Sequence, residues 1–270
     1  MRVVSVRLIG ALVFASSLMV VSSCEKKKLG EGETSSPFLT VEKKNMSFIQ
    51  KYSGTWCAPC GGWGFTTFAS LIDQFGTTDA FGAVVSGDMA GADNESIFDA
   101  HATMYGSAIT GTPTFLCNMQ VTQATSAMVE GHRSAPVVAG ANYELSLEAT
   151  KIKFKTTTQF FTASEGKDYY LFPYVIVDGI VADQAGNAAG AATVHKKTIV
   201  TVANLAGMLE NSTQGYKIAS GEIRENYKVN LDFETNRLAS WPDAKISVVL
   251  VIATKNSSGK FVFVNAYTKH

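Results

Sequence analysis

The sequence has neither the excess of basic residues that nucleic-acid binding needs nor the closely spaced Cys and His residues that bind zinc. Its 23 Lys and Arg residues are matched by 23 Asp and Glu residues, and outside the N-terminal tether no basic patch offers a phosphate backbone a binding surface. Besides one close cysteine pair, no second Cys or His pair has a spacing suited to zinc. The four histidines also have no nucleophile or ligand partner in sequence: His101, His132, His195 and His270. We therefore expect no nucleic-acid partner, no metal site and no cofactor.

The apolar run near the N-terminus, Leu8 to Val20, is shorter than the length that a membrane-spanning helix usually has. Arg2 and Arg7 precede this run, and small residues lead from it to Cys24. The pattern resembles a bacterial lipoprotein signal that is cut before Cys24, whose thiol then carries lipid. An ordinary secretory signal or an uncleaved membrane helix is the alternative. We predict a signal peptide over residues 1–23 and a polar, lipidated tether over 24–37 that holds the protein at a membrane.

The clearest chemical signal is Cys57-Ala58-Pro59-Cys60. At the start of a helix, two cysteines with this spacing are close enough for a disulfide, and the helix N-terminus favours thiolate at the first of them. Cys57 is then the nucleophile that attacks a partner's disulfide, and Cys60 resolves the mixed disulfide. An exported chain meets an oxidising compartment, where such a pair can form and keep its bond. The remaining cysteine, Cys117, is expected to be a buried core thiol.

Periodicity predicts an alternating α/β order of elements in the first half of the chain. Alternating strands and helices imply parallel strands joined by crossover connections. The expected strands and helices cover Met46–Tyr52, Ala58–Phe75, Phe81–Ser86, Glu95–Tyr105 and Thr114–Cys117. We assign residues 38–132 to this domain.

Beyond about Arg133 every second residue becomes apolar, as in Tyr143–Glu148 and Tyr227–Glu234, and small polar turns separate the runs. Period-two strands of this kind are typical of antiparallel sheets with one buried face. We therefore predict an all-β, immunoglobulin-like sandwich domain over residues 133–270.

The active-site sequence Trp56-Cys57-Ala58-Pro59-Cys60 resembles that of thioredoxin, and Gly111-Thr112-Pro113 resembles the stretch that ends in its cis-proline. The whole architecture is similar to the twenty-eight-kilodalton outer-membrane-protein family of Gram-negative lipoproteins, which pair a thioredoxin-like domain with a β-sandwich. The resemblance implies that Thr112 and Pro113 contact the substrate and that Trp56 shields the dithiol. It also implies a cell-envelope location, and Glu25 after the lipid cysteine favours the outer membrane.

Two residues are expected to modulate the dithiol in opposite directions. Lys51 stands where thioredoxin has a buried acid. If its ammonium points at the sulfurs, it favours thiolate and makes the pair a better oxidant; the alternative is that it points outward from an edge strand. Pro59 restricts the loop and favours a compact disulfide. Gly61, Gly62 and Gly64 load the first helical turns with poor helix formers, either to admit a substrate backbone or to let Trp63 pack.

Two functions fit these observations. The first is thiol–disulfide exchange on exported proteins, with a partner dithiol protein supplying the electrons. The second is a non-catalytic outer-membrane or surface binding lipoprotein, in which the Cys57–Cys60 disulfide is structural and the β-sandwich engages the partner. The fold alone does not decide between them.

Overall fold

A computed structural model describes residues 37–87, 89, 94–105, 109, 111–121, 126–208 and 213–270. The predicted signal peptide, Cys24 and all but the last residue of the predicted tether lie outside the described residues. Within the described part of the chain, no helix has the length and apolar character needed to cross a membrane.

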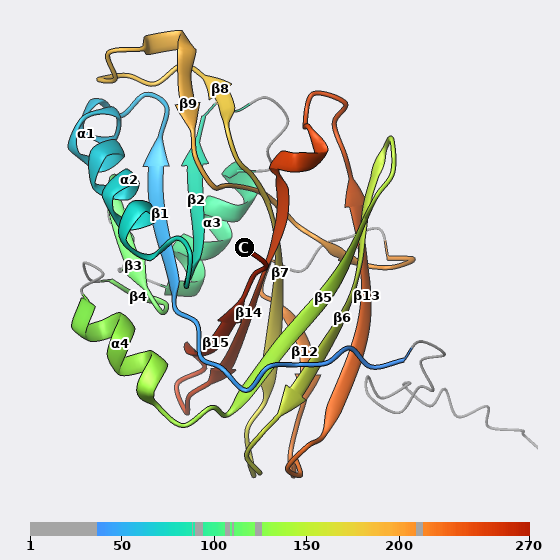
Figure 1. Ribbon diagram of the computed structural model, residues 1–270. Coiled ribbons are helices and arrows are strands. Elements are labelled where there is room, and N and C mark those ends of the chain that lie inside the picture. Colours follow the sequence, from blue (N-terminus) through green and yellow to red (C-terminus); the bar gives the residue numbers. More distant parts are fainter. Residues whose placement is uncertain are drawn as a thin grey trace, which may run out of the picture.

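The first half of the chain has the predicted order of strands and helices, and it contains the cysteine pair. The helix expected over residues 58–75 is divided at Gly62, where the backbone leaves the helical conformation (φ −84°, ψ −110°). The elements, shown in Figure 1, are β1 (Phe48–Gly54), α1 (Ala58–Gly61), α2 (Trp63–Phe75), β2 (Ala80–Ser86), α3 (Asn94–Tyr105), β3 (Thr114–Cys117), β4 (Gln120–Val121) and α4 (Ser126–Ser134).

The two halves are joined through one mixed sheet of nine strands. β1 lies between β2, its parallel neighbour, and β3, its antiparallel neighbour. On the other side of β2, the sheet continues into the second half through β10, which pairs with β2 at Thr198 and Ala83. The strands of the second half in this sheet are β7 (Tyr169–Val177), β10 (Thr198–Val202), β12 (Tyr216–Ala219), β14 (Ile246–Lys255) and β15 (Phe261–Tyr267).

Because this sheet is shared between the halves, the structure does not confirm a separate immunoglobulin-like sandwich. β7 and β14 are buried along nearly their whole length, on both faces, because they lie inside the large sheet. The predicted boundary after residue 132 falls inside α4. That each half folds as its own domain stays a prediction. Alternation along a strand reports how many of its faces are buried, but it does not say which strands lie beside it.

A second sheet of four antiparallel strands packs against the second-half part of the large sheet. Its order is β11-β13-β6-β5, and aromatic rings fill the layer, with Phe154 stacked on Phe233 at 5.3 Å between ring centroids. Its strands are β5 (Ala139–Leu147), β6 (Lys151–Phe160), β11 (Asn204–Leu205) and β13 (Lys228–Asn236).

A two-stranded hairpin of β8 (Ile180–Ala182) and β9 (Thr193–His195) leaves this β-rich half and reaches the end of the molecule where α1 lies (Figure 1). The hairpin brings second-half residues to the cysteine pair.

Candidate functional site

Cys57 and Cys60 form a disulfide at the N-terminus of α1. Cys57 is the N-cap residue, and the backbone N–H of Cys60 donates to its Sγ over 3.2 Å. Pro59 lies in the first helical turn, where a missing N–H costs nothing. A backbone N–H and the helix N-terminus thus both face the Cys57 sulfur, an arrangement that stabilises a thiolate there.

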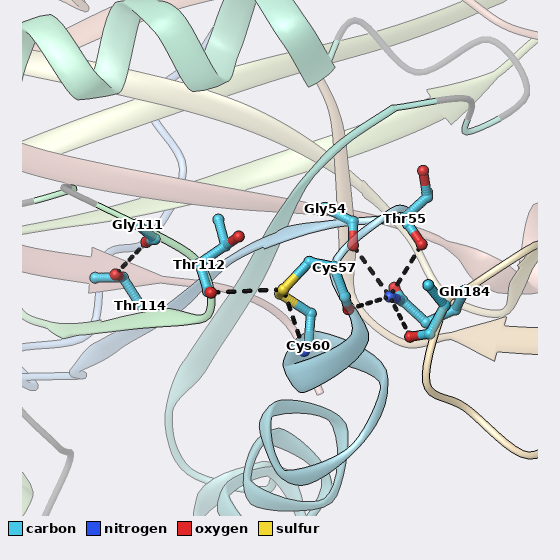
Figure 2. Close-up of a disulfide and its surroundings, with 9 residues drawn as sticks. Gly54, Thr55, Cys57, Cys60, Gly111, Thr112, Thr114 and Gln184 are labelled. Carbon is cyan, nitrogen blue, oxygen red and sulfur yellow. Dashed lines mark hydrogen bonds between the residues drawn. A yellow bond between two sulfur atoms is a disulfide. The ribbon is translucent and has the colours of Figure 1, made fainter.

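Thr112 and Pro113 lie beside the disulfide, as the resemblance implied. Their peptide bond is cis, and the carbonyl oxygen of Thr112 is 3.5 Å from Cys57 Sγ (Figure 2). α2 packs closely on this loop, since a Cβ at Gly64 would come within 2.8 Å of the Pro113 ring. Gly64 therefore serves the contact with Pro113 and not the packing of Trp63, whose side chain is 53% exposed.

Trp56 is the most exposed aromatic residue of the site, at 67%. Its indole packs against Gly54, where a Cβ would lie 2.8 Å from the ring. Cys57, in contrast, is only 5% exposed and Cys60 is fully buried. Trp56 thus offers most of its side chain to an incoming molecule.

Lys51 is buried, at 3% exposure, which rules out the alternative of an outward-pointing lysine on an edge strand. β1 is an interior strand, and the side chain turns toward α2, with Nζ 5.3 Å from the ring centroid of Phe65 and 5.1 Å from that of Phe68. Burial lowers the pKa of Lys51 to about 8. No carboxylate of the described residues lies within ion-pair distance of it. Among the described residues, the groups that stabilise this ammonium are the faces of Phe65 and Phe68.

Gln184, which no sequence motif indicated, lies at the centre of the contact between the hairpin and the cysteine pair. Its side chain is buried, and Nε2 lies within hydrogen-bond distance of the carbonyl oxygens of Gly54, Thr55 and Cys57, at 3.0, 3.3 and 3.1 Å (Figure 2). The backbone N–H of Ala185 also donates to Thr55 O over 2.7 Å. These bonds fix the turn that leads from β1 into α1.

Two glycines make this contact possible. A Cβ at Gly61 would lie 2.2 Å from the carbonyl oxygen of Ala185, and a Cβ at Gly186 would lie 2.2 Å from that of Ala58. Gly186 also has a positive φ of +76°, which side chains disfavour. The missing side chain at Gly61 therefore makes room for the chain's own hairpin, not for a substrate backbone.

His195, at the end of β9, also comes to this site. It is 2% exposed and lies edge-on to Phe65, with 6.3 Å between ring centroids. Burial, followed by the charge of Lys51, lowers the pKa of His195 to about 4. Lys51 and His195 thus approach the same phenylalanine from the two halves of the chain, and His195 is neutral at neutral pH.

The other cysteine and histidines stay apart from the disulfide. Cys117 is a buried thiol on β3, as predicted, and burial and the charge of Asp79 raise its pKa to about 11. His101 is buried between two tyrosines. In the described part of the chain, no cluster of three His, Cys, Asp or Glu residues could hold a metal ion.

The strand, the Cys-x-x-Cys helix and the adjacent Thr-Pro loop have the arrangement of a thioredoxin-like fold. Among solved structures, the chain resembles HBP35 of Porphyromonas gingivalis, with a TM-score of 0.66 over 85% of this chain and 76% of that one. The sequences are 16% identical, so the likeness concerns the fold. No family model and no curated protein matches the chain.

Proposed function

We propose that this protein is a thiol–disulfide oxidoreductase that acts on exported proteins. The observation that carries the proposal is the placement of Cys57: its sulfur caps α1, accepts the N–H of Cys60 and lies 3.5 Å from Thr112 O. A purely structural disulfide needs neither a thiolate-stabilising helix end nor an adjoining loop that presents backbone to a partner.

The reaction moves two electrons between two pairs of sulfurs. In the direction that reduces the partner, the Cys57 thiolate attacks a partner disulfide, a Cys57–partner bond forms, and the partner's other sulfur leaves as thiolate. The Cys60 thiolate then attacks Cys57, re-forms the Cys57–Cys60 bond and releases the partner's second sulfur. The two protons lost by the cysteines pass to the released thiolates. The partner is thereby reduced; with the protein oxidised and a partner dithiol, the same steps run in reverse.

We place this reaction in the cell envelope, as the lipoprotein-like N-terminus and the resemblance to the outer-membrane lipoproteins suggest. The lipid on Cys24 then anchors the protein to the outer membrane, and the folded part meets proteins that have left the cytoplasm. Labelling with a radioactive fatty acid tests this part: a Cys24→Ala variant is expected to lose the label.

The reduction potential of the Cys57–Cys60 pair tests the redox function. We would measure it by thiol trapping in glutathione buffers, with Cys24 and Cys117 replaced by alanine. A value of about −120 to −270 mV is that of an exchange catalyst, and it also gives the favoured direction. A value below about −300 mV, or thiols that cannot be trapped, would contradict the proposal.

That second result would favour the binding lipoprotein with a structural disulfide. Two observations support this binding function: Gln184 and Ala185 hold the turn before α1 in place, and Cys60 is fully buried. In that case the β-rich second half engages the partner, and replacing both cysteines by alanine leaves binding intact.

Lys51→Met is expected to lower the reduction potential by about 30 mV, the equivalent of about 1.4 kcal/mol. The ammonium favours thiolate and so stabilises the reduced form, whereas methionine has a similar volume and no charge. Because the pKa of Lys51 is about 8, the wild-type ammonium is lost as pH rises through 8, and the difference between the two proteins should shrink there. An equal potential at pH 7 would show that the field of Lys51 does not reach the sulfurs.

A further inference from the structure

The hairpin from the second half of the chain is bound to both ends of the segment that contains the cysteine pair. At the first end, Gln184 Nε2 lies 3.0 Å from Gly54 O and 3.1 Å from Cys57 O (Figure 2). At the second end, Asn187 Nδ2 donates to Gly61 O over 3.3 Å. The two cysteines therefore lie between two attachment points that belong to a single turn of the hairpin.

The need to pair buried polar groups does not explain the glutamine at this place. The carbonyl oxygens of Gly54, Thr55 and Cys57 each accept a backbone N–H as well. Gln184 Oε1, in contrast, is buried and has no hydrogen-bond partner among the described residues, which destabilises the folded chain. What the side chain contributes is geometry, because one nitrogen atom holds together three carbonyl groups of the turn that leads into α1.

This attachment acts on the closing of the disulfide. Reduction lets the two sulfurs move apart, and the resolving step must bring them back into contact. A backbone held at both ends limits this movement, so it favours the closed pair and shortens the search of one sulfur for the other. The first attack, on a partner, depends less on it, because the Cys57 sulfur lies beside Thr112 O, on the side of the site away from Gln184 (Figure 2).

We infer that Gln184 is a positioning residue of the redox site: it holds the pair in the geometry of the disulfide and speeds the attack of the Cys60 thiolate on Cys57 Sγ. In that step the Cys57–Cys60 bond forms, the bond between Cys57 and the partner breaks, and the partner's sulfur leaves as a thiolate. The inference rests on the redox function proposed above and makes the second half of the chain part of the site. Gln184 thus favours the oxidised form, whereas Lys51 favours the reduced form.

Gln184→Met tests the inference in the full-length protein with Cys24 and Cys117 replaced by alanine. Methionine has a similar length but no hydrogen-bond donor. We expect the equilibrium constant for closing the disulfide to fall about tenfold, so that the reduction potential in glutathione buffers rises by about 30 mV. Gln159→Met is the matched control, since Gln159 lies on β6 and its Nε2 donates to Asn226 Oδ1 over 3.2 Å. The control should keep the wild-type potential, and a wild-type potential for Gln184→Met would overturn the inference.

A single-turnover reaction separates the two chemical steps. The reduced protein is mixed with the disulfide of mercaptoethanol and 2-nitro-5-thiobenzoate. Attack by Cys57 joins it to mercaptoethanol and expels the coloured thiolate, and mass spectrometry after acid quenching then follows the loss of this adduct as Cys60 resolves it. For Gln184→Met we expect release of the coloured thiolate within about twofold of wild type and an adduct that lives about tenfold longer. Equal slowing of both steps would show that Gln184 only supports the fold of α1, and the inference would be wrong.

Asn187→Ala provides the test if Gln184→Met does not fold. It removes the bond to Gly61 at the second end of the segment, and we expect the same two changes at about threefold. In that case a wild-type potential and adduct lifetime would overturn the inference. If the wild-type protein itself releases no coloured thiolate, the redox function has failed and the inference fails with it. Normal wild-type kinetics with unaltered variants would remove the inference alone.

Discussion

Replacing Cys57 by serine is expected to abolish thiol–disulfide exchange, because the attacking atom is lost and a serine hydroxyl does not form the mixed disulfide. Replacing Cys60 by serine should have a different effect. Cys57 can still attack, but nothing resolves the product, so the protein should accumulate in covalent complexes with its partners. Non-reducing electrophoresis of membrane fractions would show these complexes for Cys60→Ser and not for Cys57→Ser, and mass spectrometry would identify the trapped chains.

Cys117→Ala is the matched control for both variants. Its thiol is buried on β3, and its raised pKa of about 11 keeps it protonated at neutral pH. We therefore expect full exchange activity and no trapped complexes with this variant. A double variant Cys57→Ser, Cys60→Ser that keeps wild-type activity would contradict the assignment of the site.

The sequence was enough to predict the parts of the site that depend on local patterns. Cys57, Pro59 and Cys60 lie together at the start of one helix, and Thr112–Pro113 lies in a loop beside them. Both parts were predicted from short motifs. The burial of Lys51 was not predicted, because it depends on which strands lie beside β1. Its strand is flanked on both sides, with Ala83 and Phe115 beside Lys51 in the register. Only a long-range pairing makes that strand an interior one.

The same limit explains why the contribution of the second half was missed. The large sheet crosses between the halves where Thr198 pairs with Ala83, and Gln184 reaches α1 from more than a hundred residues away. Neither contact has a local sequence signature, since glutamine is an ordinary loop residue. One glycine did carry a signal: Gly61 lies in a helix, where glycine is unfavourable. Gly186, its counterpart in the hairpin, lies two residues after Gln184. Gly61 was therefore interpreted as making room for a neighbour, a substrate backbone or Trp63, but nothing in the sequence showed that this neighbour is the hairpin at Gly186.

The two halves also meet at His101, and this contact is expected to make the fold sensitive to acid. His101 on α3 is fully buried, with Nδ1 2.7 Å from the Tyr52 hydroxyl on β1 and Nε2 2.9 Å from the Tyr174 hydroxyl on β7. A neutral imidazole donates to one tyrosine hydroxyl and accepts from the other, so both contacts are satisfied without an added proton, and protonation would place a charge in this buried site. Burial accordingly lowers the pKa of His101 from 6.5 to about 3.

Because the pKa of His101 is lower in the folded chain than in the unfolded one, acid favours unfolding. Below pH 6.5 the unfolded chain binds a proton that the folded chain refuses, so the free energy of unfolding should fall as pH decreases from 6.5 to about 3, by about 4 kcal/mol in all. Glutamine can donate to one tyrosine and accept from the other without titrating. We therefore expect His101→Gln to be less stable than wild type at pH 7 but to lose less stability on acidification, as measured by urea unfolding at pH 7, 5 and 4. His270→Gln, which replaces an exposed histidine, should change the pH dependence much less than His101→Gln, because burial lowers the pKa of His270 less than that of His101. If His101→Gln and wild type lose stability in parallel between pH 6 and 4, His101 does not couple the junction of the two halves to pH.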